Sequence, residues 1–544
     1  MLHEFLSFGP GGFLYWCDRR KIRPKLISVA PTSAASGKVA EETCWGVLQD
    51  VELLKYRPLP NAIGYVTVDL LGLFPKLLDL QIDCYLLYNV NFPSRSSACA
   101  LTCLEIHRSH FYFNSFENLV QMCPVLEVVK IHNCYGICLH NLQYLIGHAT
   151  NLQLLHCDVI SVDEVKDNVA DSRRNAAKGN PSMRCLHLHL YELYVDEDDE
   201  DEEDYSRMLY ESVCCILKQC PNVEEICLDG FRYKNVPFVQ FSFADIISTH
   251  WHHVQQLSLK HMALCNELFQ CIITSCGDSL THLCLDEIEF LDFPSTLDCS
   301  LLFSAFPHLQ SLQLAADNCN LLTKPPAMFQ DTLHTLILPN REETMPLLLT
   351  MFPALHTITV FVTDYDQILT PYPAMTQITS LSLTTDQSLR SKINHEIKQP
   401  SQQQQQRKNN VDIPPVDRKM LTFAAYTALQ SLSLKDTYLY PMELSSILTL
   451  PKLHSLELDS IGAKHDMILF SPHTYPSSQL APLHSLSFTG EVIIRFTEYK
   501  LRTLLMRFPS LETLQLSHTR CKLPEKIWKE VKAEYRYRLL TAWP

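Results

Sequence analysis

Glycine is scarce in this chain, with only 14 glycines among 544 residues. Nucleotide-binding folds hold phosphate groups on glycine-rich loops, and no GxxxxGK[ST] motif occurs here. Gly9, Gly11 and Gly12 do not follow a predicted strand, so they give no dinucleotide-binding fingerprint. The G-x-S-x-G and protein-kinase motifs are also missing. The sequence therefore predicts a protein that is not an enzyme and needs no cofactor.

Long apolar runs and an excess of basic charge are missing as well. No segment approaches the roughly 20 apolar residues that cross a bilayer, and residues 1–16 lack the features of a secretory signal. We therefore expect a cytoplasmic or nuclear protein whose 21 cysteines are mostly reduced thiols. The net charge of −15 offers no basic face for phosphates, so we expect no nucleic-acid partner and no membrane partner.

What the chain does contain is an apolar–x–x–apolar–x–apolar hexamer that recurs sixteen times, mostly every 22 to 31 residues. The hexamers begin at Leu77, Leu101, Leu126, Leu152, Met183, Val223, Val254, Leu280, Leu309, Leu333, Leu355, Ile378, Leu429, Leu453, Leu483 and Leu511. Alternation within a hexamer predicts a strand. Apolar residues upstream recur at helical spacing, and a proline such as Pro509 often separates the two segments.

One strand and one helix cannot bury their apolar faces alone, so neighbouring units must stack. The predicted fold is α/β: a leucine-rich-repeat solenoid of about 16 repeats, with a curved parallel sheet on the concave side and helices on the convex side.

The segments CPNVEEICL (220–228), CPVLEVVKI (123–131) and FPSLETLQL (508–516) resemble the repeats of F-box/leucine-rich-repeat proteins, and are similar to ribonuclease-inhibitor-like repeats. The resemblance covers roughly residues 60–520. Two features depart from it: the asparagine that often follows the strand is mostly missing, and residues 1–60 contain no recognisable F-box. The resemblance implies substrate selection for a cullin-type ubiquitin ligase, with the ligase adaptor bound through the N-terminal region.

Composition divides the chain into three parts. Residues 1–60 are expected to form an irregular N-terminal cap or degenerate domain, residues 61–520 the solenoid, and residues 521–544 a C-terminal capping helix. Two long intervals interrupt the repeats. The first is an acidic loop at 191–206, which we expect to be solvated. The alternative is that this loop docks a basic partner. The second is a Gln-rich insert at 391–420, expected to be disordered.

The central outward residue of each hexamer is the candidate for protein binding on the concave face. The chosen residues are Gln81, Glu105, Lys130, His156, His187, Ser258, Gln313, Thr359, Glu457 and Gln515. Few of them are charged, so a partner recognised by shape and hydrogen bonds fits better than one captured by charge. The alternative is that these residues only satisfy strand geometry.

Metal ligation was considered for the pairs Cys134/Cys138 and Cys99/Cys103 and for the histidines around Trp251. Neither cysteine pair has a second pair at finger-like distance, and His187 and His189 simply share one strand face, so no metal site is predicted. The favoured function is a non-enzymatic protein-recognition scaffold, for which the resemblance implies the role of substrate-recognition subunit of a cullin-type ubiquitin ligase. The alternative is a stand-alone leucine-rich-repeat inhibitor or scaffold without a ligase link.

Overall fold

The computed structural model describes the chain in segments that fall into two compact units. The described residues are 25–29, 50–56, 66–67, 76–91, 99–111, 115–134, 136–137, 139–158, 179–190, 212–230, 237–291, 297–315, 319–320, 331–342, 352–362, 376–385, 423–435, 441–459, 469, 480–489, 497–516 and 530. Unit 1 comprises residues 1–308 and 318–321, and unit 2 comprises residues 309–317 and 322–544.

Unit 1 contains a parallel sheet in which each strand pairs with the strand of the next repeat. In chain order its strands are β1 (Leu26–Val29), β2 (Leu53–Tyr56), β4 (Asp79–Asn91), β5 (Cys103–Phe111), β6 (Val128–His132), β7 (Leu154–Cys157), β8 (Cys185–His189), β9 (Glu225–Asp229), β10 (Gln256–Lys260) and β12 (His282–Asp286). The short strand β3 (Val66–Thr67) pairs with the end of β4. Two further short parallel pairs are β11 (Ala263–Cys265) with β13 (Glu289–Leu291), and β14 (Leu297–Asp298) with β16 (Cys319–Asn320).

Unit 2 repeats the arrangement with a second run of parallel pairs. Its strands are β15 (Ser311–Ala315), β17 (Thr335–Glu342), β18 (Thr357–Val362), β19 (Ser380–Thr385), β20 (Ser431–Lys435), β21 (Ser455–Leu458), β22 (Ser485–Phe488) and β23 (Thr513–Leu516). Leu312 pairs with Leu336, and Leu336 pairs with Ile358, so these leucine and isoleucine positions occupy adjacent strands.

Equivalent hexamer positions stack directly on one another. In unit 1, Leu104 pairs with Val129, Val129 with Leu155, and Leu155 with Leu186. All four are fully buried. The burial pattern of β6 alternates half-buried and buried residues, as a strand with period two requires. Each of the sixteen hexamers contains the start of a strand. The prediction of an α/β leucine-rich-repeat solenoid is confirmed.

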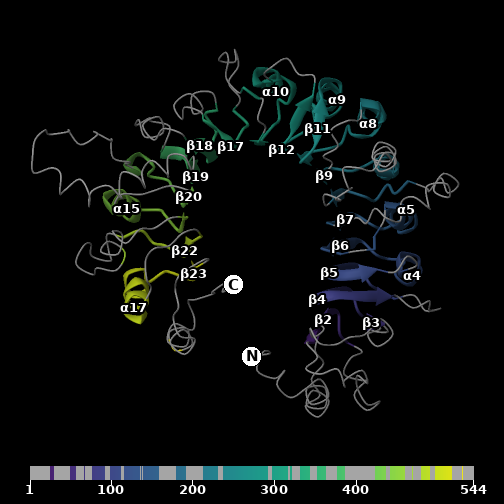
Figure 1. Ribbon diagram of the computed structural model, residues 1–544, viewed down its shortest axis with the longest axis horizontal. Helices are drawn as coiled ribbons and strands as arrows, with labels where there is room; N and C mark the ends of the chain where they lie inside the picture. The colour runs from purple at the N-terminus through teal and green to yellow at the C-terminus, as the bar shows by residue number, and fades with distance from the viewer. Residues whose placement is uncertain are drawn as a thin grey trace, which may run out of the picture. The chain divides into compact units, whose positions relative to one another are not determined.

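Helices lie on one side of the strands in both units (Figure 1). They are α4 (Ser115–Met122), α5 (Leu139–His148), α8 (Pro237–His250), α9 (Asn266–Cys276) and α10 (Cys299–Ala305) in unit 1, with α15 (Pro441–Leu448), α17 (Glu498–Arg507) and the 3-10 helix η5 (Phe423–Ala425) in unit 2. The proline register marks the helix ends: α4 ends at Met122 before Cys123–Pro124, and α17 ends at Arg507 before Phe508–Pro509. Cys123 and Phe508 are buried, so the residue before each of these prolines packs into the core.

The backbone turns sharply where several strands of unit 1 end. Arg108, Asn133, His261 and Glu287 all adopt φ near +50°, and Gly230 adopts φ +86°. All five occupy the eighth position counted from a hexamer's first residue. A left-handed conformation costs a residue with a side chain about 1–2 kcal/mol, and Asn133 is the only asparagine among these five positions. The turn therefore persists where the sequence lacks the asparagine common in such repeats.

Two strands of the parallel sheet lie within residues 1–60, where the sequence predicts an irregular cap or degenerate domain. Strands β1 and β2 extend the parallel sheet from β4, so at least residues 26–29 and 53–56 belong to the solenoid and not to a separate cap ending at residue 60. Residues 51–56 (VELLKY) in fact match the hexamer, with Val51 and Leu54 buried. The acidic loop 191–206, the insert 391–420 and all of the expected capping helix 521–544 except Glu530 lie outside the described residues.

Candidate functional site

The sheet of each unit has one face turned away from the helices, which we call the helix-free face (Figure 1). The ten residues predicted to bind a partner lie at equivalent positions on this face. In unit 1, Gln81 pairs with Glu105, Glu105 with Lys130, Lys130 with His156, and His156 with His187. Ser258 continues the same row two strands further on. The structure thus brings six of the predicted residues into one polar row.

The other predicted residues form a second row in unit 2. Gln313 pairs with Ile337, and Ile337 pairs with Thr359. Glu457 and Gln515 both pair with Ser487, on either side of it. Ser433 donates a hydrogen bond of 2.8 Å to Glu457, which joins two repeats across the face. Whether either row binds a partner stays a prediction.

Unit 1 also has a second polar row, which was not predicted from the sequence. It runs beside the first, at the seventh position from each hexamer's first residue, and comprises Asp83, His107, His132, Asp158, His189, Asp229, Lys260 and Asp286. These residues sit two positions after the central outward residue, so they share its side of the strand. A search for the same offset in successive repeats would have found them.

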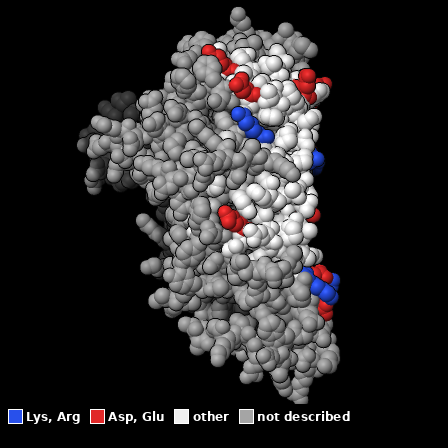
Figure 2. Space-filling model, turned by 90° about the vertical axis from the view of Figure 1, so that its right-hand side faces the viewer, with Lys and Arg blue, Asp and Glu red and all other residues white. Residues whose placement is uncertain are grey.

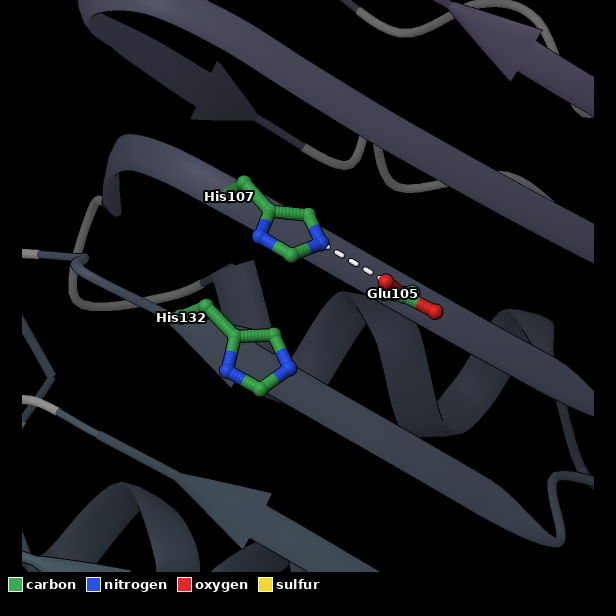
Figure 3. Close-up of side chains that lie close together, drawn as sticks. All are labelled: Glu105, His107 and His132. Atoms are coloured by element: carbon green, nitrogen blue, oxygen red, sulfur yellow. Dashed lines mark hydrogen bonds and ion pairs between the residues drawn. The ribbon is translucent and has the colours of Figure 1, made fainter. Parts of the chain in front are cut away.

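Imidazole and carboxylate groups of the two rows contact each other across neighbouring strands. His132 Nδ1 lies 2.6 Å from Asp158 Oδ2, and His156 Nε2 lies 2.5 Å from Asp158 Oδ1. On β5, His107 Nε2 lies 2.7 Å from Glu105 Oε1 (Figure 3). The ring of His132 stacks on His107 with centroids 4.6 Å apart and meets His156 edge-on at the same distance. We call these five residues the histidine–carboxylate cluster.

The histidines keep the two carboxylates of the cluster ionised. Burial raises the pKa of Asp158, but hydrogen bonds from His132 and His156 and their charges outweigh burial and hold that pKa below its usual range. Glu105 shows the same balance. Burial raises its pKa, but the hydrogen bond and the charge of His107 have the larger effect, so the pKa is lowered overall. The cluster therefore places two carboxylates with lowered pKa values against three imidazoles.

The polar contacts continue along unit 1 beyond the cluster. His187 Nε2 lies 2.9 Å from Glu225 Oε1, and burial lowers the pKa of His187 although Glu225 opposes that effect. His261 Nδ1 lies 2.6 Å from Asp229 Oδ1, and His189 Nε2 lies 3.6 Å from the other oxygen, Asp229 Oδ2. Imidazoles thus meet carboxylates at several successive strands, and each pair joins two repeats or two rows.

A pocket of about 420 Å³ opens beside the cluster on the helix-free face. Its walls are Lys55, Gln81, Asp83, Glu105, His107, Arg108 and Asn133. Arg108 forms an ion pair with Asp83 there. Lys55 comes from β2 and was missed because the hexamer at residues 51–56 was not recognised. Both signs of charge line this pocket, so it favours a polar ligand over an apolar one.

The cysteines considered as metal ligands have other contacts. Cys99 Sγ lies 3.1 Å from Cys123 Sγ, while Cys103 lies beside Asp79. Cys134 is buried and hydrogen-bonds to backbone atoms, and Cys138 lies outside the described residues. His252 and His253 line a surface pocket next to Arg184 and Glu224. None of these residues belongs to a group of three metal-ligating side chains within the described part of the chain.

The Cys99–Cys123 contact predicts an unusually reactive thiol. The hydrogen bond with Cys123 lowers the pKa of Cys99 to about 7, against opposing burial. At pH 7 about half of the Cys99 side chain is then thiolate, whereas an ordinary thiol with a pKa near 9 is about 1% thiolate. The thiolate of Cys99 is also less basic, which reduces its nucleophilicity by roughly tenfold. We expect iodoacetamide to label Cys99 about fivefold faster than an exposed reference thiol at pH 7. The measurement is peptide mass spectrometry as a function of pH.

The variant Cys123→Ala is the control for this prediction, because it removes the hydrogen-bond donor and leaves Cys99 in place. The labelling rate of Cys99 should then rise only near pH 9, and equal pH profiles for the two proteins would contradict the assignment.

Charged groups are few on the part of the helix side of unit 1 that the structure describes. Figure 2 shows isolated acidic and basic groups among mostly uncharged atoms on the described surface of that side, without a patch of one sign. Among the described residues no helix is long and apolar enough to cross a membrane.

No family model matches the chain, and no curated protein matches it. Among solved structures, it is similar to TLR13 in a complex with single-stranded RNA, with 16% identity and a TM-score of 0.40 over 92% of this chain and 63% of that chain. A leucine-rich-repeat protein of Leptospira interrogans matches over 94% of both chains with 15% identity and a TM-score of 0.32. A chain of the yeast Rad7–Elc1 complex matches with 15% identity and a TM-score of 0.34, over 72% of this chain and 87% of that one.

These likenesses concern the fold alone, and the in-register parallel strands define the chain as a leucine-rich-repeat solenoid. The F-box-like character suggested by the repeat sequences stays a prediction. One of the similar proteins is solved with RNA. The expectation from net charge that this chain binds no nucleic acid stays a prediction.

Proposed function

We propose that this protein is a non-enzymatic recognition scaffold that binds a protein partner on the helix-free face of unit 1. The observation that carries the proposal is the pair of parallel polar rows across β4 to β10, in which equivalent positions of successive repeats stand side by side.

Parallel sheets normally have both faces covered, because helices pack on either side. Here the described helices lie on one side only (Figure 1). The side chains of the rows are half-buried by their neighbours, so they are held in place before a partner arrives. A face that is already ordered loses less conformational entropy on binding. This supports recognition over a purely structural role for the rows.

The chemistry of the face favours a peptide or protein surface with both donors and acceptors. The two rows contain both carboxylates and imidazoles, and Lys130 is the cation in register between Glu105 and His156. A surface of mixed sign discriminates partners by matched hydrogen bonds, since like charges placed opposite each other oppose binding.

Two roles fit such a scaffold. The resemblance of the repeat sequences favours a substrate-recognition subunit of a cullin-type ubiquitin ligase. The alternative is a stand-alone inhibitor or scaffold, favoured by the lack of a recognisable F-box in residues 1–60. Affinity purification of the full chain separates them: a cullin and its adaptor co-purify in the first case, and a partner without ligase subunits in the second.

Matched charge reversals test the face itself. Glu105→Lys changes a residue of the polar row, and Glu117→Lys makes the same change at an exposed position of α4. Gln81→Lys is a second variant of the row, with no carboxylate lost. We expect both row variants to reduce recovery of the partner at least about tenfold, as removal of a central contact does, and Glu117→Lys to leave it unchanged.

Thermal unfolding of each variant controls for misfolding. Equal recovery with all three folded variants would place the partner elsewhere and refute the proposal for this face. A loss confined to Glu117→Lys would place the partner on the helices.

A further inference from the structure

The histidine–carboxylate cluster contains a set of side chains suited to a metal ion. Asp158 stands between two imidazoles, with its Oδ2 2.6 Å from His132 Nδ1 and its Oδ1 2.5 Å from His156 Nε2. The three side chains come from two adjacent repeats and their ligand atoms lie within 4.8 Å of one another. Their exposed fractions are 19%, 31% and 18% for His132, His156 and Asp158, so the group is sheltered yet reachable.

The geometry is close to that of a zinc site. Zinc binds histidine nitrogen and carboxylate oxygen at about 2.0–2.2 Å in a tetrahedron, which places ligand atoms roughly 3.3 Å apart. The nitrogen and oxygen atoms here are closer, because protons now join them. Replacing those protons by an ion requires the side chains to separate by less than about 1 Å.

The donor set also selects the ion. Two imidazoles and one carboxylate suit zinc and similar transition metals, whereas Mg²⁺ and Ca²⁺ prefer sites built from oxygen. Asp158 supplies the carboxylate of the set, between the imidazoles of His132 and His156. The nearby cation Lys130 exerts its charge on Glu105 and Cys103.

A second group supports the first from the neighbouring strand. Glu105, His107 and His132 also have ligand atoms within 4.8 Å of one another, and they share His132 with the first group (Figure 3). Ligating histidines commonly donate their other ring N–H to a carboxylate, which fixes the orientation of the ring. Glu105 holds His107 in this way through a contact of 2.7 Å, and the stack of His107 on His132 limits the rotation of the His132 ring.

We propose that unit 1 binds one Zn²⁺ ion through His132, His156 and Asp158, with water in the fourth position on the helix-free face. The ion links β6 to the turn after β7 and holds these two repeats in register. It also places a positive centre within a face that otherwise carries mainly carboxylates and imidazoles. The inference does not depend on the proposed recognition function, because metal binding is measured without a partner.

The test uses the full chain without a histidine tag, stripped of metal by a chelator and then titrated with Zn²⁺ against a chromophoric competitor. We expect wild-type protein to bind one ion that Asp158→Asn binds at least about 100-fold more weakly, since even the loss of an outer-shell partner costs 10–100-fold. Co²⁺ should give the visible absorption of a tetrahedral site in wild-type protein, and Asp158→Asn should lack it.

His454→Gln is the matched control, because His454 also stacks on a histidine of the next repeat, His484, with centroids 5.1 Å apart. It should bind zinc as wild type does. His156→Gln serves as the second ligand variant if Asp158→Asn does not fold. The proposal is overturned if the wild-type chain binds no zinc, if ligand variants and wild type bind it equally, or if His454→Gln loses as much affinity as they do.

Discussion

Replacing Leu257 by aspartate should unfold the repeats around β10 in unit 1, whereas the same change at the next residue, Ser258, should be tolerated. Leu257 is 1% exposed on β10, where it pairs with Ile226 on one side and Leu283 on the other. The variant loses the packing of a buried leucine, at about 2–5 kcal/mol. It also buries a carboxylate without a partner, which costs several kcal/mol more. The sum is comparable to the whole stability of an ordinary domain.

Ser258 is half-buried on the helix-free face, between Cys227 and Cys284. An aspartate there reaches solvent, so we expect the free energy of unfolding to change by no more than about 1 kcal/mol. Urea unfolding followed by circular dichroism measures both variants, and Leu257→Ala provides an intermediate loss of about 2–5 kcal/mol if Leu257→Asp yields no folded protein. Similar stability of Leu257→Asp and Ser258→Asp would show that the alternation along β10 is assigned to the wrong faces.

This contrast depends on the part of the structure that the sequence predicts best. A solenoid repeat contacts mainly its neighbours, so a hexamer read locally determines both the strand and the face of each residue. Val129 and Leu155 could be assigned to the core from their positions alone. The strand β2 was predictable by the same rule from residues 51–56. The strand β1 was not, because Pro24 occupies its first apolar position.

The candidate site was predictable only in part. The row from Gln81 to His187 follows from the hexamer, since equal positions stack. The contact of Asp158 with both His132 and His156 does not follow from the hexamer. His132 lies 26 residues away at the equivalent position of the preceding repeat, whereas His156 lies only two residues away in the same repeat. Such a contact depends on where β7 ends and how its following turn directs a side chain. Those features arise from backbone geometry that no residue pattern in the hexamer records.

Substituting alanine for Gly230 is the second change expected to have a large effect. Gly230 follows β9 with φ +86°, and a Cβ atom built on it would lie 1.7 Å from the carbonyl oxygen of Leu190. The obstacle is backbone of the preceding repeat, which no side-chain rotation can relieve. Strain from the left-handed conformation adds about 1–2 kcal/mol to a clash that itself costs about 1–3 kcal/mol or more. We expect a loss of at least about 3 kcal/mol in the free energy of unfolding.

Gly179→Ala is the matched control, because the nearest atom to its added Cβ is the carbonyl oxygen of Gln219 at 3.4 Å and no left-handed φ is involved. It should change the free energy of unfolding by less than about 1 kcal/mol. Hydrogen exchange adds a local readout, since Gly230 donates its backbone N–H to Lys260 and Leu190 donates to Asp229. Faster exchange should concentrate at residues 185–190 and 225–230 in Gly230→Ala. If the two glycine variants unfold alike, the close approach of these two repeats is wrong, and with it the spacing that brings the rows of the helix-free face together.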